Sequence, residues 1–114
     1  MEDTTLSVAM TAAELAGFEA QADAVAVMLK SLANRRRLMA MCQLVERGEM
    51  RVTDLAATVG LSQSALSQHL AVLRAAGLVA FRCEAQVLWY RIADPRTEQL
   101  LATLHRLYCQ EPIR

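Results

Sequence analysis

Aromatic residues are scarce in this sequence, and long uninterrupted apolar runs are missing. Phe, Trp and Tyr make up 4% of the 114 residues, whereas 54% of the residues are hydrophobic. A core of this composition is built from Leu, Val, Ala and Met, which favours helices over a sandwich of strands. No stretch approaches the roughly 20 apolar residues that a membrane-spanning helix needs. We therefore expect a mainly helical protein with no membrane partner.

Lysine and arginine are missing from residues 1–29, which carry acidic residues only. The rest of the chain holds all 12 basic residues, although the formal net charge is zero. An acidic start does not resemble a signal peptide, so we expect a cytoplasmic protein. A basic body suits binding to a phosphate backbone. Residues 1–10 are predicted to form a flexible arm, and residues 11–111 a single domain.

Cysteines are few as well. Three cysteines, an odd number at wide spacing, are unsuited to a structural disulfide framework in the cytoplasm, so we expect free thiols. Cys42 falls on an apolar helical stripe, where a thiol often serves only as a small core residue. Cys109 lies on the flank of a leucine stripe, one helical turn from His105. Cys83 is interpreted as a packing thiol or a bystander, with tuning of DNA contact as the alternative.

Cap signals divide the chain into helices. The predicted helices span 11–31, as one long helix or two abutting helices interrupted at Gly17, and 34–46, 54–59, 62–77 and 94–111. Their caps are Thr11, Asn34, Thr53, Ser62 and Asp94. Gly48 and Glu49 are predicted to break the chain. The first helix carries an apolar stripe, which either covers the helix's own domain or pairs two subunits. The stripe is formed by Val25, Met28, Leu29 and Leu32.

The helix at 62–77 has an unusual polar face. Three leucines at helical spacing face a core, and the first two turns carry short hydrogen-bonding side chains instead of Lys and Glu. These are Gln63, Ser64, Ser67, Gln68 and His69. Such side chains suit the reading of base edges in a major groove, although an ordinary amphipathic helix would also present a polar side to water. A short helix and a turn at Gly60 precede this helix, which is the helix-turn-helix pattern.

Two runs with strand character, 79–83 and 87–92, follow this helix. A hairpin at this point makes the predicted fold a winged helix-turn-helix, mainly α with a two-stranded wing. Arg82 and Arg91 are placed where strand residues could reach a sugar-phosphate backbone. The Arg35-Arg36-Arg37 cluster either touches phosphates or forms a solvated helix start, and cations there oppose the helix dipole.

These elements together resemble the ArsR family of dimeric winged-helix repressors. The resemblance rests on Leu-Ala-Asn-x-x-Arg-Leu at 32–38 and Leu-Ser-Gln-His-Leu-x-x-Leu-Arg-x-Ala-Gly-Leu-Val at 66–79, and it covers about residues 20–110. It implies a homodimer paired through the first and last helices. Two-fold symmetry then implies double-stranded operator DNA with an inverted repeat.

The cysteines indicate a subgroup of that family. Residues 49–55 lack the thiols that arsenic and cadmium sensors carry there, and the last helix has one His where zinc and cobalt sensors use several. The placement of Cys42 and Cys109 is similar to the persulfide-sensing subgroup. That resemblance implies a repressor that binds DNA when both thiols are reduced, and is released when reactive sulfur species bridge them.

Rival functions remain open on the same residues. If Cys42, Cys109 and His105 bind a metal ion, the protein is a metal-responsive repressor. If oxidation of the thiols is the signal, it is a general redox-responsive repressor. An enzyme using Cys109 and His105 lacks an oxyanion loop and a third orienting residue, so we expect no enzyme, cofactor or bound metal. A dimerisation module without DNA binding is the remaining alternative.

Overall fold

The computed structural model describes residues 10–109, which form five helices and three strands. In chain order these are α1 (Ala12–Leu32), α2 (Arg35–Arg47), β1 (Glu49–Arg51), α3 (Val52–Val59), α4 (Gln63–Ala75), β2 (Val79–Glu84), β3 (Val87–Ile92) and α5 (Pro95–Tyr108). The arm predicted at 1–10 lies outside the described residues except for Met10, as do the last two positions of the domain predicted at 11–111.

Most predicted helix starts are confirmed by their cap hydrogen bonds. The Thr11 hydroxyl accepts from the Glu14 N–H at 3.0 Å, and the Glu14 carboxylate accepts from the Thr11 N–H at 2.9 Å, which completes the capping box. The side chains of Asn34, Ser62 and Asp94 cap α2, α4 and α5 in the same way. These caps work because the first N–H groups of a helix have no partner within it.

The predicted cap at Thr53 is wrong. Arg51 occupies the cap position of α3, makes no side-chain cap bond, and leaves Thr53 inside the first helical turn. The cause is β1, a strand that the sequence pattern did not predict. Gly48, at φ +84°, ends α2 as expected, but Glu49 begins β1 and the extended backbone continues to Arg51.

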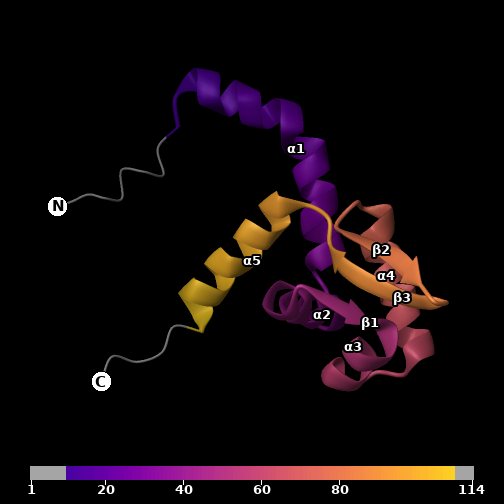
Figure 1. Ribbon diagram of the computed structural model, residues 1–114. Helices are drawn as coiled ribbons and strands as arrows, with labels where there is room; N and C mark the ends of the chain where they lie inside the picture. Colours follow the sequence, from indigo (N-terminus) through magenta and orange to yellow (C-terminus); the bar gives the residue numbers. More distant parts are fainter. Residues whose placement is uncertain (1–9, 110–114) are drawn as a thin grey trace, which may run out of the picture.

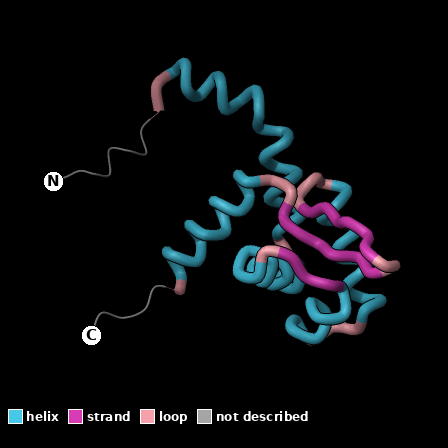
Figure 2. The backbone as a smooth tube through the Cα atoms, in the orientation of Figure 1, coloured by secondary structure: helices cyan, strands magenta, loops and turns pink. Residues whose placement is uncertain are grey.

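The predicted hairpin wing is confirmed and extended by one strand. The antiparallel sheet has the order β1-β3-β2, so β3 is central (Figure 2). Tyr90 pairs with Met50 on one side and with Phe81 on the other. Tyr90 and Met50 are buried against the helices. The opposite face of the sheet carries Trp89, which pairs with Arg51 and Arg82.

The core lies among α2, α3 and α4, under the sheet. Its fully buried large side chains include Met41, Leu44, Leu55, Leu66, Leu70 and Leu73. The three leucines of α4 are those predicted to face inward at helical spacing. The core therefore holds α4 rigidly while leaving its other face to solvent.

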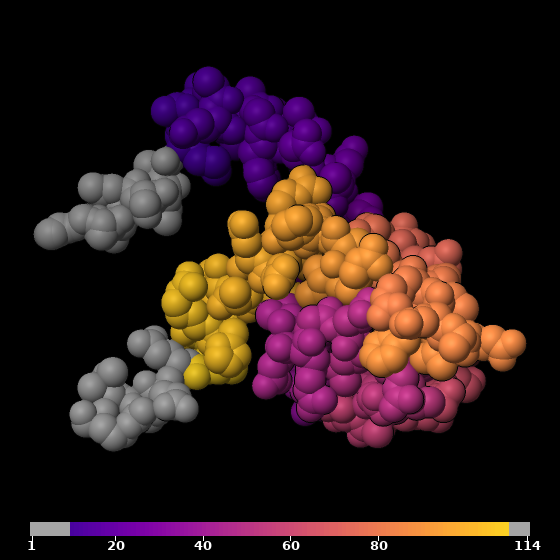
Figure 3. Space-filling view, viewed as in Figure 1, coloured from indigo at the N-terminus to yellow at the C-terminus, as the bar shows by residue number. Residues whose placement is uncertain are grey.

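Helices α1 and α5 extend away from this core (Figures 1 and 3). Leu32 is buried at the end of α1, but Leu29, predicted on the same stripe, is 50% exposed. Phe18 on α1 is 50% exposed and Tyr108 on α5 is 82% exposed. Among the described residues, no helix combines the length and the apolar character needed to cross a membrane.

Candidate nucleic-acid interface and thiol site

Four of the five polar residues predicted on α4 are exposed together. We call Gln63, Ser64, Ser67 and Gln68 the reading face; all four are exposed, while Leu66, Leu70 and Leu73 on the other side are 0% exposed. The Ser62 hydroxyl accepts from the Ala65 N–H at 3.1 Å and holds the start of α4. The reading face carries amides and hydroxyls and no charge over its first two turns.

His69 is placed differently from its prediction. Its side chain is half-buried, and its Nδ1 lies 3.4 Å from Nη1 of Arg37 on α2. The ring therefore sits at the edge of the reading face and contacts the first turn of α2. Helical spacing alone could not show this contact, because Arg37 belongs to another helix.

The arginine cluster at the start of α2 has a role that the sequence pattern did not suggest. Nη1 of Arg36 donates to the carbonyl of Val59 at 2.9 Å, at the end of α3. Nε of Arg37 donates to the carbonyl of Ser31 at 2.6 Å, in the last turn of α1. Cations oppose the dipole of α2 at this point, but they satisfy carbonyls at the C-terminal ends of α1 and α3, where positive charge is stabilising.

Arg82, predicted to reach a sugar-phosphate backbone, is engaged within the protein. Its Nε and Nη2 donate to the two carboxylate oxygens of Glu49 at 2.9 and 3.0 Å, and its Nη1 donates to Glu84 at 2.6 Å. Its guanidinium also lies over the ring of Trp89. The hydrogen bond from Arg82 lowers the pKa of Glu49 because it stabilises the ionised carboxylate. A phosphate would have to compete with these two carboxylates.

A groove of about 310 Å³ separates the wing from α4. Gln63 and Ser67 of the reading face line one side, and Gln86 at the wing tip and Thr53 at the start of α3 line the other. Sequence reasoning missed Thr53 and Gln86 as members of this surface. The missing signal was β1, because its pairing with β3 brings the start of α3 against the wing.

The structure brings the two predicted sensing thiols to one groove between α2 and α5. Cys42 is half-buried and Cys109 is exposed, and both line this space of about 310 Å³, which we call the thiol groove. Its other lining residues are Leu38, Met39, Leu101, Leu104, His105 and Tyr108. Burial raises the pKa of the Cys42 thiol, and the nearby Cys109 raises it further.

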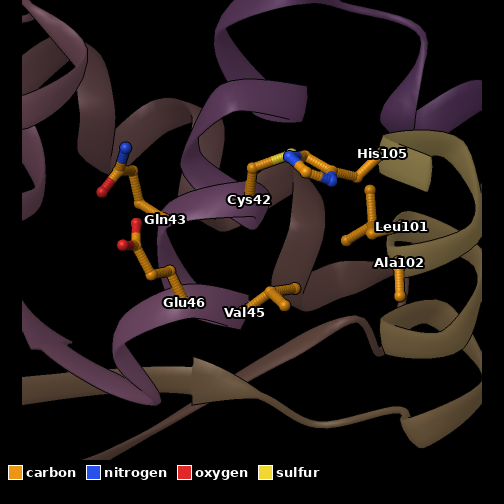
Figure 4. A pocket seen from close by; sticks show the side chains of 7 residues that line it. All are labelled: Cys42, Gln43, Val45, Glu46, Leu101, Ala102 and His105. Carbon is orange, nitrogen blue, oxygen red and sulfur yellow. The ribbon is translucent and has the colours of Figure 1, made fainter. Parts of the chain in front are cut away.

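A second cavity of about 490 Å³ lies on another side of Cys42. Figure 4 shows the Cys42 side chain directed from α2 toward α5, where His105 projects, while Gln43 and Glu46 point to the other side of α2. Cys42 therefore has open space on both flanks. Cys83 is exposed on β2 in the wing and lines neither space.

The alternative metal site would draw on Cys42, Cys109 and His105, which all line the thiol groove. Within residues 10–109, no three His, Cys, Asp or Glu side chains gather closely enough to hold a metal ion. A structural zinc site requires four ligands and a catalytic site three. Cys42, Cys109 and His105 share a groove without forming such a ligand set.

Comparison with known proteins agrees with this architecture. Residues 34–80 match the family described as bacterial regulatory protein, arsR family. The transcriptional activator HlyU of Vibrio cholerae is 49% identical over 84 residues, which cover 74% of this chain and 77% of HlyU. The crystal structure of the transcriptional repressor BigR from Xylella fastidiosa has a TM-score of 0.79 at 37% identity, covering 90% of this chain and 100% of that chain.

A third relative is described as a homodimer. The winged helix-turn-helix DNA-binding domain Mb0332 of Mycobacterium bovis has a TM-score of 0.70 at 32% identity, covering 84% of this chain and 93% of that chain. The identities and coverage, together with the winged helix-turn-helix, show that this chain belongs to the arsR family and is a transcriptional regulator of the HlyU and BigR type.

Proposed function

We propose that this protein is a dithiol-controlled repressor. As a homodimer it binds an inverted-repeat operator while Cys42 and Cys109 are reduced, and it is released when persulfides or polysulfides bridge the two thiols. The observation that carries the proposal is the thiol groove, in which two cysteines from α2 and α5 face a common space. Release then permits transcription of genes for the sulfide response.

DNA recognition is assigned to α4. The side chains of Gln63, Ser67 and Gln68 are exposed on a helix whose other side is locked into the core. Gln pairs well with adenine in the major groove, and Ser accepts or donates to several base edges. His69 and Ser64 contribute at the margins of the same helix, and Arg82 reaches the backbone only by leaving its carboxylate partners.

Pairing of two subunits is assigned to α1 and α5. Both helices expose large apolar side chains outside the core, namely Leu15, Phe18, Val27, Leu29, Leu107 and Tyr108. Surfaces of this kind mark protein interfaces, and a two-fold pair places two copies of α4 at matching half-sites. The homodimer reported for Mb0332 supports this assignment.

The sensing chemistry begins at Cys109. The Cys109 thiolate attacks the outer sulfur of a persulfide RSSH, the S–S bond breaks, and RS⁻ leaves with Cys109 now carrying an S–SH group. The Cys42 thiolate then attacks the Cys109 sulfur, HS⁻ leaves, and a disulfide forms. Each further donor that reacts before closure adds one sulfur to the bridge. The donor is reduced to a thiol, and no additional oxidant is needed.

Exposure and acidity support this order of events. Cys109 is exposed at the end of α5, where a bulky donor can reach it. Cys42 lies half-buried in the thiol groove, and burial holds its pKa above the ordinary value, so it is a slow first nucleophile. Inside the thiol groove, Cys42 has to react only with the persulfide on Cys109.

The bridge controls DNA binding by tying α2 to α5. Helix α2 packs into the core beside α3 and α4, whereas α5 belongs to the pairing surface. A bridge between them changes the relation of the core to the partner subunit, and with it the separation of the two α4 helices. The regulation requires only that operator DNA bind the reduced form more tightly.

The test combines intact-protein mass spectrometry with an operator gel shift. Wild type, Cys42→Ser, Cys109→Ser and the control Cys83→Ser are treated in turn with an organic persulfide, peroxide and a disulfide. We expect persulfide to bridge and release wild type and the Cys83 control. Cys42→Ser should accumulate a persulfide on Cys109 and stay on DNA. Cys109→Ser should form no bridge and stay on DNA, although its exposed Cys83 can still take up sulfur.

Two results would contradict the proposed persulfide response. Release of both Cys42→Ser and Cys109→Ser by persulfide would show that these thiols are not the sensor. Equal release of wild type by peroxide, with an ordinary disulfide and no inserted sulfur, would instead indicate a general redox-responsive repressor.

A further inference from the structure

We infer that Arg37 is the positioning residue that joins the thiol-bearing helix α2 to the DNA-reading helix α4. It does so by holding His69 in one tautomer and one orientation. This role rests on the proposed function for its regulatory consequence, but the positioning itself is independent of sensing. Arg37 makes three contacts, one through its backbone N–H and two through its guanidinium.

Arg37 lies in the first turn of α2, upstream of Cys42 on the same helix. Its backbone N–H donates to the Asn34 side chain at 3.0 Å, its Nε donates to the Ser31 carbonyl at 2.6 Å, and its Nη1 faces Nδ1 of His69 at 3.4 Å. The guanidinium thus touches the end of α1 and the middle of α4, while the backbone of Arg37 is held by the cap at the start of α2. No other side chain in the described part of the chain hydrogen-bonds to both α1 and α4.

The contact with His69 determines where the imidazole proton sits. A guanidinium has donors only and stays protonated in proteins. Nδ1 of His69 must therefore accept the hydrogen bond, which places the proton on Nε2 in the neutral ring. Nε2–H is on the far side of the ring from Arg37, so His69 offers its donor away from α2, at the edge of the reading face.

The neighbouring arginine strengthens the connection. Arg36 holds the carbonyl of Val59, next to the Gly60 turn that leads into α4, at 2.9 Å. The first turn of α2 therefore contacts α4 through Arg37 and the end of α3 through Arg36. A displacement of α2 caused by a bridge at Cys42 would reach both helices of the DNA-binding unit through these two side chains.

The test uses His69 variants, because they leave the Arg37 contact with α1 intact. His69→Asn keeps an acceptor near the Nδ1 position, whereas His69→Leu removes it. Arg37→Met removes the donor, and Arg35→Met is the matched control because Arg35 is exposed at the same helix start. Two quantities are measured: the imidazole tautomer by long-range ¹H–¹⁵N NMR, and the ratio of operator affinities of the reduced and persulfide-bridged forms.

We expect His69 of the reduced wild type to show the Nε2–H tautomer, and Arg37→Met to shift it to a mixture while His105 stays unchanged. The affinity ratio should be about fivefold or more in wild type, Arg35→Met and His69→Asn, and at least about twofold smaller than in wild type in His69→Leu and Arg37→Met.

Different failures have different meanings. An unchanged His69 tautomer in Arg37→Met overturns the positioning role, whatever the thiols do. A wild-type ratio above fivefold that His69→Leu preserves overturns the coupling through Arg37. A wild-type ratio of one contradicts the proposed sensing function and the coupling with it, while the tautomer measurement still decides the positioning role.

Discussion

The attachment of α5 to the core yields a quantitative prediction about two leucines. Leu101 on α5 is 3% exposed and Leu66 on α4 is 0% exposed, so burial alone would assign them equal weight. Their surroundings differ, because Leu101 lines both cavities beside Cys42, whereas Leu66 lies among the helices of the core. Truncation to alanine should therefore cost different amounts of unfolding free energy.

The magnitudes follow from what each truncation leaves behind. Leu→Ala removes three carbon groups, which cost about 2.4 kcal/mol at about 0.8 kcal/mol each in lost transfer energy. At Leu101 the space opens into the existing cavities and solvent can enter, so little is added. At Leu66 a closed void remains, and the cost should rise to about 4 kcal/mol. We expect Leu66→Ala to be the more destabilising variant by about 1–2 kcal/mol.

Denaturant unfolding of both variants against wild type measures this difference. The protomer concentration must be the same throughout, because subunit pairing contributes to the stability of a dimer. The m-value serves as the control, since an unchanged slope means that the same surface unfolds. If Leu101→Ala costs as much as Leu66→Ala, the cavities beside Cys42 are closed in solution and the reasoning is refuted.

Three further predictions concern the thiols, the wing and the pairing surface. Burial raises the pKa of Cys42, so its thiolate fraction and the rate of bridge closure should increase about tenfold per pH unit from about pH 7 to pH 9. Quenched alkylation measures this rate, and a rate that does not change with pH would contradict a protonated Cys42. Glu49→Gln combined with Glu84→Gln should free Arg82 and steepen the salt dependence of operator binding by about one phosphate contact relative to Glu46→Gln, and an unchanged slope would show that Arg82 does not reach DNA. Phe18→Asp should weaken the homodimer at least about tenfold in sedimentation, whereas an intact dimer would place this part of α1 outside the interface.

Local rules were sufficient for most of the fold. Caps at Thr11, Asn34, Ser62 and Asp94 depend on residues two or three positions away, and each forms the predicted bond. Apolar spacing identified the buried side of α4, and alternation identified the wing strands. The cap prediction at Thr53 was wrong because the cap signal is local, whereas the extended backbone of β1 is set by its pairing with β3, which no local sequence pattern predicts.

The candidate site shows the same division. Helical spacing predicted that Gln63, Ser64, Ser67 and Gln68 would share an exposed face, because residues on one helix have a known angular relation. The individual positions of Cys42 and Cys109 on their helices could also be read from the chain. Their meeting in the thiol groove could not, since it depends on how α5 packs against α2.

The positions predicted from the sequence differ most from the structure at long charged side chains. Arg82 and Glu49 are 33 positions apart, and Arg37 and His69 are 32 positions apart, yet each pair is in contact. Composition and periodicity describe a side chain by its own helix or strand, so they leave Arg82 free and His69 exposed. The packing of α2 against α4, and of β1 against β3, supplies the partners. Helix identity is therefore a local property of this chain, whereas the partner of a long charged side chain is set by which elements fold against each other.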